Sequence, residues 1–163
     1  MKNTYQFCTI AGMTVSELHF GMDEEHLDCI ALKLCLANRI AEVHAGGVTN
    51  FVCNCEWGVL LWAAEAVIAL KNTFDIRLNI VQPFEGQADR YSKEVRERFF
   101  NVHSRADSVI TMHKKYYEDC YRDADIRMID NSDILLTDDT DSFIARYAVW
   151  KGRRIGFISY LPF

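Results

Sequence analysis

The chain has 163 residues, a formal net charge of −5 and a hydrophobic fraction of 50%. This length fits a single domain over residues 1–163 with a full apolar core, and only 2 prolines and 8 glycines exclude collagen-like, low-complexity and disordered chains. The acidic balance argues against a nucleic-acid partner, and no apolar run reaches the roughly 18 residues of a membrane span, so we expect no membrane partner.

Short segments of β-strand character alternate with longer segments of helical periodicity. The first strand is predicted at 6–10, and a helix over 23–45 follows it and ends at two glycines. The remaining segments are predicted as a strand at 50–53, a helix at 57–71, a strand at 77–81, a helix at 89–102, a strand at 108–112, a helix at 117–130, a strand at 133–137, a helix at 141–151 and a strand at 154–159.

This alternation predicts an α/β fold. Strands that are separated by helices pair in parallel through right-handed crossovers, so we expect a Rossmann-like, open, mostly parallel sheet of about six strands with helices on both faces. Ligands of such sheets bind beyond the carboxyl ends of the strands. The loops that follow the predicted strands are therefore the segments in which a site is expected.

The N-terminal segment and the cysteines indicate the compartment. Met1 to Cys8 carry a single positive charge and lack the apolar run of a signal peptide, so we expect a cytoplasmic protein. The 6 cysteines lie mostly inside apolar segments, which favours buried, reduced thiols over a disulfide framework.

An ordered series of short segments carries a family resemblance. The series is Phe51, Trp62-Ala63-Ala64-Glu65, Pro83-Phe84-Glu85-Gly86-Gln87, Ala106-Asp107-Ser108-Val109, Met128-Ile129-Asp130 and Arg146-Tyr147-Ala148. In this order the chain resembles the YpsA-like branch of the SLOG superfamily, Rossmann-like proteins named for the Smf/DprA and LOG proteins. The resemblance implies a pocket for nucleotide-like ligands, lined by glycine-rich loops after the first, second and fifth strands, and it allows a homodimer.

The chain departs from the family pattern in those same loops. Gly12 and Gly58 remain, but Asn54 replaces a glycine, Leu60 replaces an acidic residue, and the last glycine-rich turn is replaced by residues 138–141, Asp-Asp-Thr-Asp. A phosphate at a helix N-terminus needs backbone N–H groups that glycine lets it approach, and neighbouring carboxylates repel it. The framework is thus kept while the ligand loops are changed.

The altered loops predict a non-enzymatic regulatory or interaction protein with a degraded or repurposed nucleotide pocket. By analogy with the family, it acts by binding a partner protein in cell-division control or phage–host conflict. Trp57 and Tyr117 are the predicted partner-binding residues, and no catalytic or metal-binding residue is assigned.

The alternative is a binder or slow hydrolase of a nucleotide-derived metabolite related to ADP-ribose or NAD. Under this hypothesis no cofactor is expected other than the nucleotide-derived ligand itself. Two arginines supply the positive charge that the loops have lost. The predicted ligand-binding residues are Gly12, Asn54, Gly58, Glu85, Gln87, Arg122 and Arg127.

Several of these residues have a structural explanation beside the functional one. Cys53 and Cys55 could hold a soft metal together with His113, or could be buried thiols at a strand end. Trp57 could fill the pocket mouth, stand exposed as an interface anchor, or pack against Trp62 in the core.

Two acidic segments are open to the same choice. Glu85 and Gln87 could orient a sugar or base, or Glu85 could cap a helix that begins near Asp89. The aspartates of 138–141 could bind a divalent cation or cap the helix that begins near Ser142.

Overall fold

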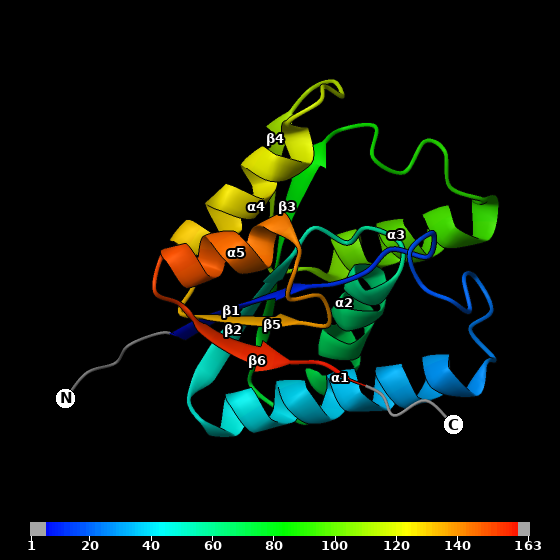
Figure 1. Ribbon diagram of the computed structural model, residues 1–163. Helices are drawn as coiled ribbons and strands as arrows, with labels where there is room; N and C mark the ends of the chain where they lie inside the picture. Colours follow the sequence, from blue (N-terminus) through cyan, green and yellow to red (C-terminus); the bar gives the residue numbers. More distant parts are fainter. Residues whose placement is uncertain (1–5, 160–163) are drawn as a thin grey trace.

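The computed structural model describes residues 6–159 (Figure 1). Residues 1–5, on which part of the argument against a signal peptide rests, lie outside this range. The strands are β1 Gln6–Ala11, β2 Val48–Cys53, β3 Arg77–Phe84, β4 Ser108–His113, β5 Ile134–Thr137 and β6 Arg154–Phe157; the helices are α1 Leu27–Ala45, α2 Val59–Leu70, α3 Lys93–Arg105, α4 Cys120–Asp130 and α5 Phe143–Trp150.

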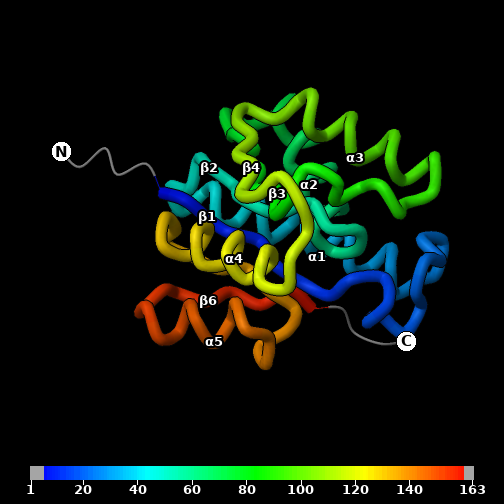
Figure 2. The backbone as a smooth tube through the Cα atoms, turned by 90° about the horizontal axis from the view of Figure 1, so that it is seen from above, coloured from blue at the N-terminus to red at the C-terminus, as the bar shows by residue number. Residues whose placement is uncertain are grey.

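The six strands form one parallel sheet in the order β4-β3-β2-β1-β5-β6. Helices α1, α2 and α3 cover one face, and α4 and α5 cover the other (Figures 1 and 2). The predicted open Rossmann-like α/β fold is therefore confirmed. Strand β1 lies between β2 and β5, where the strand order changes direction, and β1 pairs with β5 through partners such as Cys8 and Ile134.

Apolar residues fill the space between the layers. Helix α2 is buried along most of its length, and Phe51, Leu61 and Leu135 are among the largest fully buried side chains of the core. The central strands β1, β2, β3 and β5 are buried along most of their length, as expected where helices cover both faces, whereas the edge strands β4 and β6 are exposed or half-buried. Within the described residues, no helix is long and apolar enough to cross a membrane.

Two helices begin one turn later than their periodicity predicts. Helix α1 begins at Leu27 because His26 occupies the N-cap position and its Nδ1 accepts a hydrogen bond from the Asp28 amide. Helix α3 begins at Lys93 because Ser92 caps it. The suggestion that Glu85 caps a helix near Asp89 is therefore wrong.

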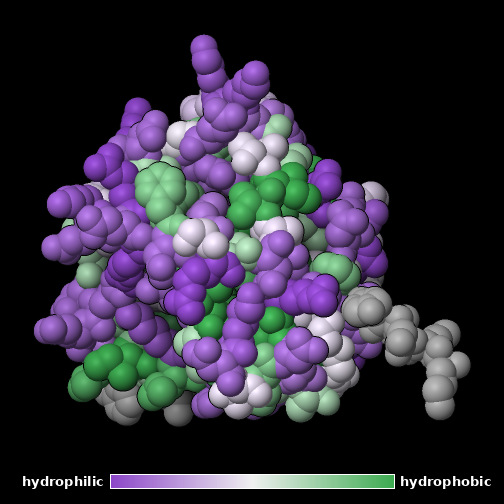
Figure 3. Space-filling model, turned by 180° about the vertical axis from the view of Figure 1, so that it is seen from behind, coloured by the Kyte–Doolittle hydropathy of each residue, from purple (hydrophilic) through white to green (hydrophobic). Residues whose placement is uncertain are grey.

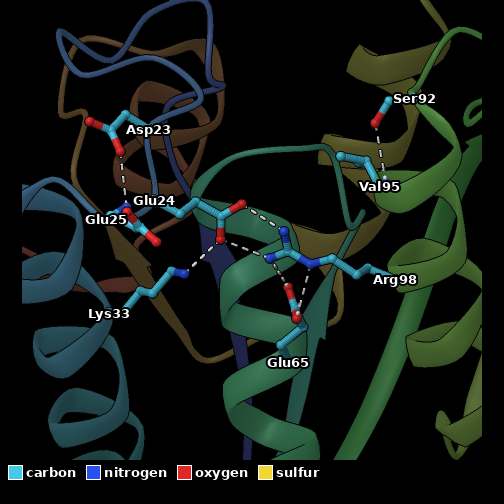
Figure 4. A network of polar contacts seen from close by, with 8 residues as sticks. All are labelled: Asp23, Glu24, Glu25, Lys33, Glu65, Ser92, Val95 and Arg98. Carbon is cyan, nitrogen blue, oxygen red and sulfur yellow. Dashed lines mark hydrogen bonds and ion pairs between the residues drawn. The ribbon is translucent and has the colours of Figure 1, made fainter.

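A charged cluster ties three helices and the segment before α1 together (Figure 4). The Arg98 guanidinium on α3 donates to Glu24 at 2.6 and 2.9 Å and to Glu65 on α2 at 2.7 Å, while Lys33 on α1 donates to Glu24 at 2.6 Å. Burial opposes ionisation of Glu24, but the hydrogen bonds from Arg98 and Lys33 outweigh it and hold its pKa below the usual value. The cluster thus fixes the segment before α1 against α1 and α3.

Arg98→Ala is expected to lower the free energy of unfolding by about 1–3 kcal/mol, because it leaves two half-buried carboxylates without their shared partner. The matched control is Lys93→Ala on the same helix, which removes an exposed contact of 4.0 Å to Glu97 and should cost less than about 0.5 kcal/mol. Urea unfolding measures both. The difference should shrink as the pH falls through the lowered pKa of Glu24, and equal losses in the two variants would contradict this role.

Candidate functional site

Two adjoining cavities lie at the carboxyl ends of the strands. The inner compartment, of about 180 Å³, is lined by Ala11, Gly12, Glu17, Asn54, Glu56, Leu60, Tyr121, Asp125, Asp139, Ser142, Phe143 and Ile144. The aromatic compartment, of about 490 Å³, is lined by Glu56, Phe84, Gly86, Gln87, Asp89, Arg90, Tyr91, Tyr116 and Tyr121. Glu56 and Tyr121 line both, so the two compartments form one cleft.

Two glycines allow the loop after β1 to pass close to α2. A Cβ on Gly12 would lie 2.5 Å from Val59 Cγ1 and 2.8 Å from Asp138 Oδ1. Gly58 has a φ of +131°, and a Cβ there would lie 2.6 Å from the Met13 carbonyl oxygen. Gly12 lines the inner compartment, whereas Gly58 lies behind it and serves the packing of the loop.

Polar side chains fix the turns that enter α2 and α5. Asn54 is 3% exposed, and its Oδ1 accepts a hydrogen bond from the Glu56 amide at 2.9 Å. Asp139 Oδ1 accepts from the Asp141 amide at 3.0 Å, and Ser142 Oγ caps α5 by accepting from the Ala145 amide. The N-cap of α5 is thus Ser142, and the interpretation that an aspartate of residues 138–141 caps this helix is wrong.

The inner compartment is acidic. Burial, with a smaller contribution from Glu17, raises the pKa of Glu56 to about 7, and burial together with Glu56 raises the pKa of Asp125 to about 7. Neither of these two carboxyls hydrogen-bonds to another of residues 6–159. Lysine, arginine and histidine do not occur among the lining residues. A phosphate would meet only like charge here.

Packed rings wall the aromatic compartment. Phe84 contacts Tyr116 and Tyr121 edge to face, with ring centroids 5.4 and 6.2 Å apart. Gln87 is 5% exposed; its Nε2 donates to the Asn54 carbonyl oxygen at 2.9 Å, and its Oε1 has no partner in the described part of the chain. Tyr91 completes the wall. The compartment thus combines aromatic surface with a buried acceptor that lacks a donor.

The predicted ligand-binding residues separate into two groups. Gly12 and Asn54 line the inner compartment, and Gln87 lines the aromatic one. Glu85 is exposed and lines neither compartment. The structure also does not bring Gly58 to either cavity.

The two arginines do not supply charge inside the cleft. The Arg122 guanidinium lies 4.9 Å from the centre of the Phe143 ring, at the edge of the inner compartment. Arg127 lines a different cavity, together with Phe7 and Asn131 near the amino end of the sheet. The hypothesis that these residues restore a phosphate site therefore lacks its geometry.

The two predicted partner-binding residues differ in exposure. Trp57 is half-buried and packs edge to face against Tyr91, at 6.1 Å between ring centres, rather than against Trp62. Tyr117 is 40% exposed, and its hydroxyl donates to Asp123. Figure 3 shows separate hydrophobic areas between hydrophilic residues on one face of the molecule. Tyr117 thus remains available to a partner, whereas Trp57 belongs to the wall behind the cleft.

The structure shows where Cys53, Cys55 and His113, the candidate ligands of a soft metal, lie and what they contact. All the cysteines are free; Cys53 and Cys55 are buried with their sulfur atoms 3.6 Å apart, and His113 instead contacts Asp123. Burial raises the pKa of the Cys55 thiol. The interpretation as buried thiols therefore fits, and the proposed His113 ligand is engaged elsewhere.

One group of residues within the described range has ligand atoms close enough for a metal ion, namely His19, His26 and Asp28. His19 Nε2 lies 2.7 Å from Asp28 Oδ2, and His26 Nδ1 already accepts from the Asp28 amide. Capping of α1 explains the position of His26, and His19 is held by its contact with the Asp28 carboxyl.

Three cleft residues do not follow from the sequence patterns: Glu56, Tyr121 and Asp125. Tyr121 and Asp125 are four residues apart on α4 and therefore share one face of that helix. The signal that could have identified Tyr121 and Asp125 is their spacing, an aromatic and an acidic residue four positions apart in a predicted helix. Asp125 also directly follows Ala124, which is buried.

Comparisons with known proteins agree on the family. A family model named YpsA and described as "YspA SLOG family" matches residues 8–148. A UPF0398 protein from Staphylococcus epidermidis is 30% identical over 143 residues, 85% of this chain and 76% of the relative. A UPF0398 protein from Shouchella clausii is 32% identical over 111 residues, 67% of this chain and 58% of the relative.

A solved structure supports the fold. DNA processing protein A from Helicobacter pylori, described for its single-stranded DNA binding mode, superposes with a TM-score of 0.61 at 15% identity. The match covers 95% of this chain and 66% of the Helicobacter pylori chain. At this identity the likeness shows the fold alone.

Proposed function

Because the chain belongs to the YpsA SLOG family, we propose that it is a non-enzymatic regulatory protein whose repurposed pocket binds a ligand without a phosphate group. The observation that carries the proposal is the acidic inner compartment. Its charged lining residues are Glu17, Glu56, Asp125 and Asp139. No basic side chain among the lining residues offsets them.

The positions of the carboxyls strengthen this argument. The N-termini of α2 and α5 are where a Rossmann-like fold holds phosphate, through free backbone N–H groups and the helix dipole. Here Glu56 precedes α2, and Asp139 binds an amide in the turn before α5. Each site that would receive a phosphate thus carries a carboxyl group of its own.

Binding without catalysis fits the other lining groups. Ser142 Oγ donates to the Asp139 carbonyl oxygen and caps α5, so it is not poised beside a base. A partner protein could sense the ligand through the loop after β4, where the exposed Tyr117 follows Tyr116 of the aromatic compartment.

The structural relative from Helicobacter pylori is described as binding single-stranded DNA. Such binding needs a positively charged groove that follows the backbone. With its net charge of −5 and acidic cleft, this chain is not expected to bind DNA at that edge.

A thermal-shift panel tests the proposal, because a ligand that binds only the folded state raises the Tm. The panel pairs adenosine with AMP and ADP, adds NAD and ADP-ribose, and includes an oligothymidine. A phosphate-free compound should raise the Tm, while its phosphorylated counterparts and the oligonucleotide should not. A rise with ADP or ADP-ribose that matches the rise with adenosine would refute the phosphate-free pocket.

A variant pair locates the effect. Asp139→Asn keeps the hydrogen bond from the Asp141 amide but removes the charge, so it should begin to admit AMP. Asp141→Asn changes an exposed carboxylate that does not line the cleft and should leave the panel unchanged. An identical response in both variants would mean that charge in the cleft does not select the ligand.

The second candidate function is slow hydrolysis of a nucleotide-derived metabolite such as NAD or ADP-ribose. It is favoured by the presence of Glu56 and Asp125 in one compartment, each with a pKa near 7, as general acids and bases require. Chromatography of such compounds after incubation with the protein would reveal it, and Asp125→Asn should abolish the product.

A further inference from the structure

We propose that the aromatic compartment binds a small organic cation, an amidinium, guanidinium or alkylammonium group on an apolar body. This inference rests on the proposed function, since it names the ligand class for one half of the same cleft. It depends on three features: the ring walls, the unsatisfied acceptor and the distribution of charge.

The walls suit a cation with an apolar body. Phe84, Tyr91, Tyr116 and Tyr121 line the compartment, and Phe84 packs edge to face against two of the tyrosines. The negative faces of such rings attract cations, and the attraction grows as water is excluded. The volume of about 490 Å³ is that of a small-molecule site.

The buried amide points to a ligand that donates hydrogen bonds. Gln87 is 5% exposed, and its Nε2 is engaged by the Asn54 carbonyl oxygen. Its Oε1 has no partner in the described part of the chain. Leaving a buried acceptor without a donor is unfavourable, so a ligand that brings an N–H group to Oε1 is favoured over one that does not. An ionised carboxylate or phosphate group offers no such donor.

The charged residues that line the aromatic compartment differ in how deeply they are buried. Asp89 and Arg90 are exposed and opposite in sign, so they offset one another at the surface. The half-buried charge is the Glu56 carboxyl, which stands between the two compartments. A cation beside Glu56 would therefore gain an interaction that water screens little.

Glu56 also makes the binding depend on pH. The groups that act on it or share its surroundings are Glu17, Asp125, Tyr91 and Tyr121, all of them acidic groups. The pKa of Glu56 is about 7, so the carboxylate forms as the pH rises from about 6 to about 8. Affinity for a cation should rise over the same range, and affinity for a neutral analogue should not.

Three probes of nearly equal shape test the inference on the full chain: benzamidine with charge +1, benzamide without charge and benzoate with charge −1. Their dissociation constants are measured by ligand-observed NMR titration at about pH 8. Benzamidine should bind at least about tenfold more tightly than benzamide, and benzoate most weakly. Equal affinities, tighter benzoate binding or no binding of benzamidine would each overturn the cation site.

Matched variants assign the binding to named residues. Glu56→Gln should weaken benzamidine about tenfold, leave benzamide unchanged and remove the pH dependence. Glu85→Gln, an exposed residue outside the cleft, is the control and should behave like the original chain. Arg90→Gln should strengthen benzamidine binding, and weaker binding there would count against the inference. Circular dichroism checks that each variant is folded.

The outcomes separate this inference from the function on which it rests. If adenosine raises the Tm while benzamidine does not bind, the cation site is wrong and the phosphate-free pocket stands. If benzamidine binds as expected while ADP raises the Tm as well, the cation site stands and the phosphate-free pocket is wrong.

Discussion

Gly58→Ala is expected to destabilise the protein by about 3–5 kcal/mol, an effect large enough to leave much of it unfolded at room temperature. Gly58 has a φ of +131°, which L residues rarely adopt, so alanine there costs about 1–3 kcal/mol in backbone strain alone. The new Cβ would also lie 2.6 Å from the Met13 carbonyl oxygen and 2.8 Å from Thr14 Cα. Both are backbone atoms, which cannot move aside as a flexible side chain would.

Gly47 provides the matched control for this substitution. It has a φ of +111°, but a Cβ there would meet nothing within 4 Å. Gly47→Ala should therefore show the strain without the clash and cost about 1–2 kcal/mol. Urea unfolding of the two variants isolates the close approach of the two loops. Equal losses would show that this approach is not needed.

Asp125→Asn is expected to stabilise the protein by about 2–4 kcal/mol at about pH 8 and to have little effect at about pH 4. Burial, with a contribution from Glu56, raises the pKa of Asp125 to about 7, whereas the unfolded chain has the ordinary carboxyl value. Between these two values the folded state binds more protons than the unfolded state. Stability therefore falls as the pH rises through that range, and the amide removes this cost.

Urea unfolding at the two pH values measures the effect. The control is Asp75→Asn, which changes an exposed carboxylate and should leave the stability within about 0.5 kcal/mol at both pH values. A destabilised Asp125→Asn at about pH 8 would mean that this carboxylate is paired in the folded protein, contrary to its surroundings. The Asp125 carboxylate would then contribute to the stability of the folded protein rather than being kept for a ligand.

The order of the elements could be predicted because strand and helix periodicities differ and buried parallel strands are continuous apolar runs. The starts of α1 and α3 could not, because the predicted helices included residues 23–26 and 89–92. The N-termini of α1 and α3 are set by His26 and Ser92, whose side chains accept hydrogen bonds from backbone amides in the first turn of each helix. Capping of this kind depends on a single side-chain orientation and leaves the apolar pattern unchanged.

The site could be predicted only where a loop follows a strand directly. Asn54 and Gln87 lie in such loops, and both line the cleft. Tyr121 and Asp125 enter it from α4, whose position over the sheet depends on the packing of the whole chain. Arg127 shows the same limit in reverse, since it is near Asp125 in sequence but lines another cavity. Two residues that are close in sequence on one helix can therefore line different cavities, and the sequence alone does not show which of them lines the cleft.

The pairing of β1 with β5 also has a consequence for the order in which the molecule assembles. Cys8 aligns with Ile134, so one side of β1 waits for a partner that is synthesised long after it, whereas β1, β2, β3 and β4 can pair with one another beforehand. Closing such a distant contact is entropically costly and slow relative to local pairing. The inner compartment has walls from both sides of this junction, so ligand affinity should appear late in refolding, after most of the helical signal has returned.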